Sequence, residues 1–383
     1  MPRGKPKRSG KTPDHVRTGA VPPEKLAQPF PPIRLPIRPP FPPEEARSVA
    51  EIPGETGWLY EPKWDGFRCL AFRKYDEVLL QSKAGQPLGR YFPELVSGLL
   101  TLPQSQFVLD GEIVILTEGH LSFDDLLLRI HPAESRIRKL STETPATLMC
   151  FDLLVDGAGE SLIGTPLRDR RKSLEKFLGS TSKAERIRLS PASRQREQAE
   201  QWMDELAAMG LDGIIAKRLE EPYRSGERTA MVKVKRIRTA DCVVGGFRYS
   251  EKGGGIGSLL LGLYTEQGML DHVGFTSSFN AGQRQELKKI VEPLILPPGF
   301  TGRAPGGPSR WSTKRSAEWE PLAPKLVCEV QYDHFSGGRF RHGTKFLRWR
   351  PEKRPVQCTM EQVRPQATIQ EFLKETPALT KAS

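Results

Sequence analysis

The stretch LYEPKWDGFRCLAF, residues 59–72, most constrains how this chain can fold. Apolar residues typical of strands flank Pro62 and the Asp65-Gly66 pair, a pattern that predicts a hairpin-like corner. Lys63 would then lie at the bend among aromatic side chains, where partial loss of solvent favours the neutral amine, a nucleophile. Taken alone, the pattern favours a surface lysine beside an ordinary Asp-Gly turn.

Two later predicted strands carry charged residues that need an explanation. In residues 107–116, Glu112 interrupts an otherwise apolar run. A buried acid costs free energy unless it is paired or bound, although a strand-end carboxylate open to solvent is the simpler alternative. Residues 231–235 alternate apolar and cationic side chains, so Lys233 and Lys235 would share one face of a strand. Two neighbouring cations repel unless an anion lies between them, which favours a phosphate site.

Residues 29–237 predict a first domain of mixed helices and strands. A disordered basic arm precedes it at 1–28, because that region is cationic and nearly free of apolar residues. The arm would either attract nucleic acid or act only as a solubilising tail. Further elements predicted in the domain are an extended proline-rich segment at 29–43, a short helix at 44–52, a strand at 148–155 around Phe151, helices at 167–178 and 197–209, and a strand at 211–217 headed by Asp212.

Residues 238–362 predict a second domain with a different layout. Short strands separated by glycine replace the longer pattern, and one helix at 283–291 lies between the third and fourth strands. Five strands with one such helix are typical of an OB-fold barrel, a frequent nucleic-acid binder. The overall fold class is therefore α+β, with a C-terminal tail at 363–383.

Charge and cysteine usage narrow the class of partner and compartment. The formal net charge of +12 and the pI near 9.5 favour a polyanionic partner. The five cysteines are scattered without a Cys-x-x-Cys pair, which indicates neither a zinc site nor a disulfide framework and fits a reduced cytosol. No apolar run approaches the ~18 residues of a membrane span, and no secretory signal opens the chain. We expect a cytoplasmic, monomeric protein.

Taken in order, several motifs resemble those of ATP-dependent DNA ligases, which belong to the covalent nucleotidyltransferases. Their amino-acid sequences are most similar to those of the compact C-type bacterial ligases. The motifs are Lys63-Trp-Asp-Gly-Phe-Arg68, Ser82-Lys-Ala-Gly85, Asp110-Gly-Glu112, Phe151-Asp152, Asp212-Gly-Ile-Ile, Lys233-Val-Lys235 and the basic segment from Phe346 to Lys353. The resemblance implies an adenylation domain of antiparallel sheets flanked by helices, followed by the OB-fold.

The resemblance also implies a role for each site residue. Lys63 would attack the α-phosphate of ATP and carry AMP as a phosphoramidate. Asp65 and Asp212 would place Mg²⁺ or Mn²⁺, and Lys83 would contact the DNA. The residues implied to hold the nucleotide are Glu61, Arg68, Glu112, Phe151, Lys233, Lys235, Arg350 and Lys353.

Two residues depart from the ligase pattern. Asp212 stands where the family usually has glutamate, so its metal contact would run through water. Lys83 replaces an arginine and cannot grip a phosphate bidentately.

The function that follows is sealing of nicks in duplex DNA, in repair and alongside other repair proteins. The alternatives are an RNA ligase, a capping-type guanylyltransferase, or a non-catalytic OB-fold protein that binds DNA.

Overall fold

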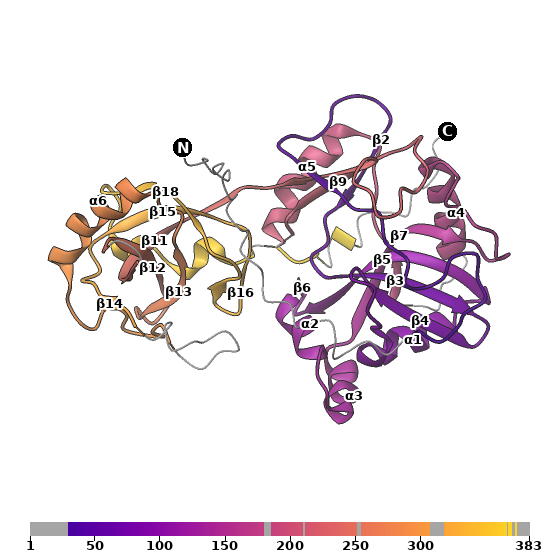
Figure 1. Cartoon of the computed structure of the whole chain (residues 1–383), viewed down its shortest axis with the longest axis horizontal. Helices are drawn as coiled ribbons and strands as arrows, with labels where there is room; N and C mark the ends of the chain where they lie inside the picture. Colours follow the sequence, from indigo (N-terminus) through magenta and orange to yellow (C-terminus); the bar gives the residue numbers. More distant parts are fainter. Residues whose placement is uncertain are drawn as a thin grey trace, which may run out of the picture.

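Two sheets packed with helices build the first part of the chain, and a curled sheet builds the second (Figure 1). The computed structural model describes residues 30–179, 185–209, 211–250, 254–306, 318–365, 367–369 and 372–373. We call residues 30–235 the N-terminal lobe and residues 238–363 the C-terminal lobe. The expected arm at 1–28 lies outside the described residues.

The smaller sheet of the N-terminal lobe has the strand order β1-β10-β9-β2. Helix α5 (Arg196–Ala208) contributes Trp202 to a core shared with Tyr60 and Ile214 from this sheet. The strands are β1 (Arg47–Val49), β2 (Trp58–Pro62), β9 (Gly213–Arg218) and β10 (Met231–Lys235).

The helix expected at 44–52 is wrong. Arg47–Val49 forms β1 instead, which pairs in parallel with β10 and places Ser48 opposite Lys233. Pairing with the edge of β10 satisfies the backbone of this segment, and this tertiary contact outweighs the local helical preference.

The larger sheet has the order β4-β3-β5-β7-β8, with β6 paired to β5. Its strands are β3 (Phe67–Lys74), β4 (Glu77–Ser82), β5 (Gln106–Thr117), β6 (His120–Leu121), β7 (Ala146–Val155) and β8 (Ile187–Leu189). The helices around it are α1 (Pro93–Leu100), α2 (Phe123–Arg129), α3 (Glu134–Glu143) and α4 (Leu167–Gly179). Leu95 of α1 and Phe177 of α4 pack into its core beside Leu153 of β7.

The hairpin expected around Lys63 is also wrong, because β2 and β3 belong to different sheets. Lys63 instead lies in the link that crosses between them, where its backbone N–H donates to the Gly213 carbonyl at 2.9 Å. Gly66 makes the crossing possible, since a Cβ there would lie 2.1 Å from the Ile113 carbonyl oxygen. The bend predicted at Asp65 and Gly66 is present, but it connects strands of two different sheets.

The C-terminal lobe is a curled sheet with the order β13-β12-β11-β15-β18. Its main elements are β11 (Arg238–Tyr249), β12 (Ile256–Tyr264), β13 (Leu270–Thr276), α6 (Ala281–Val291), β15 (Val327–Tyr332) and β18 (Lys345–Trp349). A single bridge between Thr276 and Thr344 joins the two edges. The short strand β14 (Glu320–Pro321) pairs with β11. The α+β class with an OB-like second part is confirmed.

A small hairpin projects from this lobe toward the N-terminal lobe (Figure 1). It consists of β16 (Phe335–Ser336) and β17 (Arg339–Phe340), joined by Gly337 and Gly338, both with positive φ.

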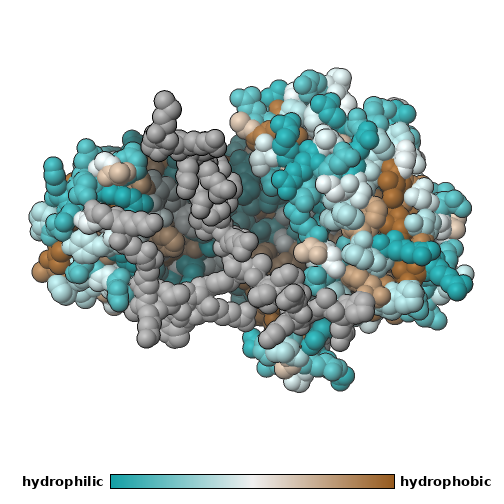
Figure 2. Space-filling view, viewed as in Figure 1, coloured by the Kyte–Doolittle hydropathy of each residue, from teal (hydrophilic) through white to brown (hydrophobic). Residues whose placement is uncertain are grey.

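The region expected as a C-terminal tail includes residues that return to the N-terminal lobe. Ile369 and Phe372 are buried in the core beneath α5, and the Phe372 ring lies 5.7 Å from Trp202. Side chains on the face in Figure 2 are mostly hydrophilic on both lobes, with an apolar patch on the N-terminal lobe. No helix in the described part of the chain has the length and apolarity to cross a membrane.

Candidate active site

A pocket opens in the N-terminal lobe where the two sheets meet, and Lys63 lines it. The Lys63 ammonium lies 3.0 Å from Asp212 Oδ2, and its side chain is 17% exposed. Gly213, next to Asp212, can only be glycine. Its φ is +149°, and a Cβ at this position would lie 2.0 Å from the Val234 carbonyl oxygen. The charged and aromatic residues around the pocket are Glu44, Glu45, Glu61, Lys63, Trp64, Arg68, Lys83, Glu112, Phe151 and Lys217.

Phe151 supplies an aromatic wall that two cations already contact. The Arg68 guanidinium lies 4.5 Å and the Lys217 ammonium 4.3 Å from the ring centroid. Arg68 donates from Nε and Nη2 to the buried Asp110 carboxylate, both at 2.6 Å. This pairing leaves Nη1 as the guanidinium nitrogen available to a ligand, so the expected contact of Arg68 with ribose is limited to one nitrogen.

Glu61 lies deep in the pocket, with 1% of its surface exposed. Lys217 pairs with its Oε2 at 2.8 Å, and the Arg171 guanidinium lies 3.5 Å from its Oε1 without forming a hydrogen bond. Oε1 therefore keeps a lone pair that could accept a hydrogen bond from the amino edge of a base. Lys217 was not among the expected site residues. Its position near the end of the strand that begins after Asp212 could have indicated it.

Two carboxylates in the pocket resist ionisation. Burial raises the pKa of Glu112 to about 7, despite the opposing effects of Arg68 and Lys63. Burial, together with Asp152, also raises the pKa of Glu44 to about 7. Glu44 is 6% exposed and its Oε1 has no hydrogen-bond partner. Glu44 was not predicted from the sequence, because an acid at the start of the helix expected at 44–52 would be solvated.

The pKa of Glu44 predicts a specific dependence of stability on pH. The pKa of Glu44 in the folded protein is about 7, above the ordinary value of 4.5. The contribution of Glu44 to the free energy of unfolding therefore falls as pH rises from 4.5 to 7 and is constant above pH 7. Glu44→Gln removes the ionisation. The variant should therefore gain roughly 2–3 kcal/mol relative to the parent between pH 4.5 and pH 8. Urea unfolding of the variant and the parent at pH 4.5 and pH 8 measures this gain. The prediction is wrong if the variant and the parent differ in free energy of unfolding by the same amount at both pH values.

The expected phosphate-binding lysines, Lys233 and Lys235, are not among the residues that line the pocket. Burial and the nearby Lys63 lower the pKa of Lys233. Lys235 is more exposed and lies 3.5 Å from Asp333 of the C-terminal lobe. Lys83, expected to contact DNA, is 59% exposed and pairs with Glu45 at 3.0 Å. The structure thus brings Lys233 near Lys63 and leaves Lys83 at the rim.

Arg350 and Lys353 do not lie in the pocket. Both pair with Asp241 inside the C-terminal lobe, at 2.9 Å and 2.6 Å. The nucleotide contacts expected of them are therefore absent from this arrangement of the two lobes.

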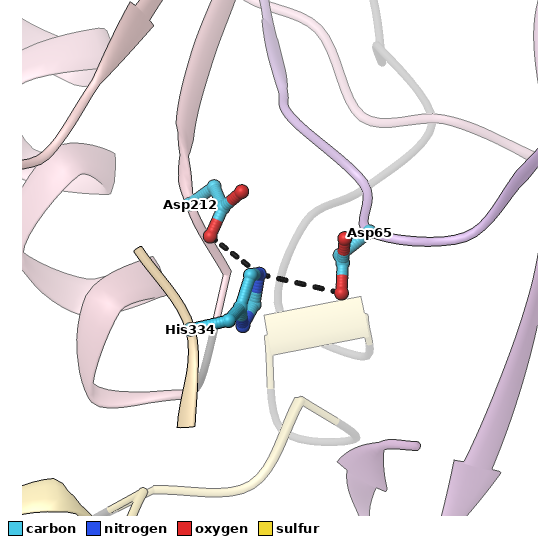
Figure 3. Close-up of side chains that lie close together, drawn as sticks. All are labelled: Asp65, Asp212 and His334. Atoms are coloured by element: carbon cyan, nitrogen blue, oxygen red, sulfur yellow. Dashed lines mark ion pairs between the residues drawn. The ribbon is translucent and has the colours of Figure 1, made fainter. Parts of the chain in front are cut away.

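Asp65 and Asp212, the expected metal ligands, face each other across a histidine from the C-terminal lobe (Figure 3). His334 Nε2 lies 2.5 Å from Asp212 Oδ1 and 3.3 Å from Asp65 Oδ2. Arg341, from the same lobe, donates to both oxygens of Asp65 at 3.1 Å and 2.7 Å. Neither His334 nor Arg341 was expected in the site, because residues so distant in sequence meet only through the packing of the lobes.

Comparisons with known proteins decide the family. The model for the "ATP dependent DNA ligase domain" matches residues 43–235, and that for the "ATP dependent DNA ligase C terminal region" matches residues 252–353. The chain belongs to the ATP-dependent DNA ligase family. DNA ligase C1 of Mycolicibacterium smegmatis is 45% identical to this ligase over 341 residues, covering 86% of this chain and 95% of that protein. DNA ligase C of Mycobacterium tuberculosis is 41% identical over 352 residues, covering 88% and 97%.

These matches confirm the expected enzyme class, a DNA ligase that uses ATP and forms phosphodiester bonds. The resemblance to the compact C-type bacterial ligases is confirmed as well. A solved structure named Pmar-Lig_PreS3 has a TM-score of 0.51 at 16% identity, covering 77% of this ligase and 64% of that chain. At that identity the likeness concerns the fold alone.

Proposed function

We propose that this ligase seals nicks in duplex DNA through an AMP that is carried on Lys63. The observation that supports this most directly is the position of Lys63, paired with Asp212 at the opening of a pocket walled by Phe151. A nucleotide stacked on Phe151 would direct its phosphates toward that opening. Three steps follow: adenylation of Lys63, transfer of AMP to a 5′-phosphate, and attack by a 3′-hydroxyl that expels AMP.

In the first step a bond forms between Lys63 Nζ and the α-phosphorus, and pyrophosphate leaves. Asp212 orients the amine through the 3.0 Å contact. Although burial favours the neutral acid, the contacts with His334 and Lys63 lower the pKa of Asp212. Asp212 is therefore a poor proton acceptor, and we assign it the orientation of Lys63 rather than general-base catalysis.

A divalent cation fits the carboxylate pair. Asp212 Oδ1 is buried and faces only His334 Nε2 among the described residues, and carboxylate oxygens are the ligands that Mg²⁺ and Mn²⁺ prefer. Asp65 and Asp212 would hold the cation, which supplies positive charge that offsets charge on the phosphate oxygens.

We further propose DNA repair as the setting, with the enzyme acting as a monomer in the cytoplasm. The net charge of +12 supports attraction to the DNA backbone. All five cysteines are buried free thiols, which suits a reducing compartment. Lys83, exposed at the rim of the pocket, is our candidate contact with the 5′-phosphate.

A sealing assay tests the proposal. Nicked duplex DNA, ATP and Mg²⁺ or Mn²⁺ should yield a sealed strand on a denaturing gel, whereas GTP should not. Sealing of a nick only within RNA, or labelling by GTP in preference to ATP, would favour the RNA ligase or capping alternatives.

Phe151→Ala should weaken the use of ATP by roughly 1–3 kcal/mol, the loss typical of base–aromatic stacking. Phe151→Leu should recover part of it through apolar contact. The apparent KM for ATP in self-adenylation measures the effect. A drop in thermal stability with unchanged KM would assign Phe151 to the core alone.

Arg350→Ala and Lys353→Ala should slow self-adenylation without DNA by roughly 10²–10³-fold, the loss typical of one donor to a transition-state charge. Pyrophosphate leaves opposite Lys63, and we propose that the C-terminal lobe swings these cations over it. The exposed link at 236–237 would serve as the hinge. Both variants should still seal pre-adenylated nicks.

The exposed Lys345→Ala, on β18, is the matched control. Normal self-adenylation in both test variants would remove this closure from the mechanism. Weaker DNA binding with a smaller salt slope would instead assign Arg350 and Lys353 to the DNA backbone.

A further inference from the structure

His334 is fixed between the lobes by the hairpin of β16 and β17. The backbone N–H of Arg341, at the far end of the hairpin, donates to the His334 carbonyl at 3.0 Å. The Arg341 guanidinium in turn lies 3.9 Å from the ring centroid of Phe123, at the start of α2. The turn of the hairpin also meets α2, since a Cβ on Gly337 would lie 2.9 Å from Asp124 Oδ2. The hairpin therefore holds the imidazole against the carboxylates.

The imidazole and the two carboxylates converge on one point. Their ligand atoms all lie within 4.8 Å of each other, and His334 is 8% exposed. His334 Nε2 lies 2.5 Å from Asp212 Oδ1 and 3.3 Å from Asp65 Oδ2, and the buried Nε2 and Asp212 Oδ1 have no other partner in the described part of the chain. A neutral imidazole nitrogen and a carboxylate oxygen this close repel each other unless a proton or a cation lies between them. A cation bound by all three ligand atoms would remove that repulsion.

We infer that His334 is a third protein ligand of the divalent cation held by Asp65 and Asp212. This inference rests on the cation site in the proposed function. Lys63 contacts Oδ2 of Asp212, so Oδ1 faces His334 Nε2 alone, at 2.5 Å. Arg341 donates once to each oxygen of Asp65, and each oxygen keeps a further lone pair. Both carboxylates thus retain a position for a cation.

Two properties follow from an imidazole ligand supplied by the C-terminal lobe. Nitrogen ligands favour Mn²⁺, Co²⁺ and Zn²⁺ over Mg²⁺, which prefers oxygen. The site should therefore select the first group when no nucleotide is present. Because Asp65 and Asp212 belong to the N-terminal lobe and His334 to the C-terminal lobe, the cation would also bridge the two lobes.

Direct titration of the full-length, nucleotide-free protein tests the inference. Free Mn²⁺ is followed by electron paramagnetic resonance, and Mg²⁺ by its competition with Mn²⁺. His334→Ala should weaken Mn²⁺ binding by at least about tenfold, the smaller loss seen even when an outer partner of a metal ligand is removed. Mg²⁺ should change less. His334→Asn keeps an oxygen ligand and should shift the preference toward Mg²⁺. The exposed His342→Ala, beside the same hairpin, is the matched control and should bind as the parent does.

Asp212→Asn separates failure of the inference from failure of the cation site. If Asp212→Asn loses Mn²⁺ while His334→Ala binds it normally, the site stands and His334 is not a ligand. If neither variant changes binding, or the parent binds no Mn²⁺, the cation site fails as well. Tighter binding in His334→Ala would show that the imidazole blocks the cation, which also overturns the inference. Thermal melts of each variant report whether it is folded.

Discussion

Lys63→Ala should lose self-adenylation by ATP by at least about 10⁴-fold, the scale on which removal of a catalytic nucleophile acts. No other amine can replace it, because the position of Lys63 depends on the link between the two sheets and on the contact with Asp212 at 3.0 Å. The same variant should still seal DNA supplied with AMP already on its 5′-phosphate. Acid-labile labelling from α-labelled ATP measures the first effect, and a gel measures the second.

Retained sealing of pre-adenylated DNA distinguishes loss of the nucleophile from misfolding, since a misfolded protein would fail both assays. Lys172→Ala, an exposed lysine on α4, is the control for loss of a positive charge. Full labelling of Lys63→Ala would show that Lys63 is not the nucleophile. Loss of both activities with an altered melting curve would show that Lys63 is needed for folding.

Asp152→Asn should destabilise the protein by roughly 3–5 kcal/mol, the cost of leaving one partner of a buried ion pair uncompensated. Arg170 donates to both oxygens of Asp152 at 2.9 Å, and the side chains are only 2% and 3% exposed. The asparagine removes the negative charge that faces the buried Arg170 guanidinium and one of its four acceptors, the others being the remaining Asp152 oxygen and the carbonyls of Thr165 and Glu221. Urea unfolding at neutral pH measures the loss.

Glu134→Gln is the matched control, because Glu134 pairs with Arg138 at 2.6 Å on the surface of α3. An exposed pair of this kind contributes less than about 1 kcal/mol. Equal losses in the two variants would mean that burial of Asp152 does not decide its contribution.

Local chemistry explains why much of this fold could be predicted from the sequence. Alternating apolar residues and glycine turns placed β5, β7, β9 and β10 close to their observed bounds. Apolar stripes did the same for α4 and α5. The resemblance to ATP-dependent DNA ligases placed Glu61, Glu112 and Phe151 beside Lys63, and all four line one pocket.

Pairing between distant segments explains what could not be predicted. Nothing in residues 59–72 indicates that β2 pairs with β9 while β3 pairs with β5. Local residues predict a turn but not which sheet each arm joins. The same limit hid β1, which exists only because β10 offers it an edge.

The electrostatic partners in the site were hidden for a similar reason. Arg68 was expected to be free for ribose, yet Asp110, 42 positions away, occupies two of its nitrogens. His334 reaches Asp65 and Asp212 only because the two lobes pack against each other. A motif can name the residues that react, but the partners of those residues are set by the packing of strands and lobes.

The position of AMP on the protein tests the central claim most directly. The ligase is incubated with ATP and a divalent cation but no DNA, digested, and examined by tandem mass spectrometry under conditions that preserve phosphoramidates. The structure predicts one adenylylated peptide, modified at Lys63. Adenylylation of Lys217 or Lys233 instead, or of no residue while nicks are still sealed, would contradict the account.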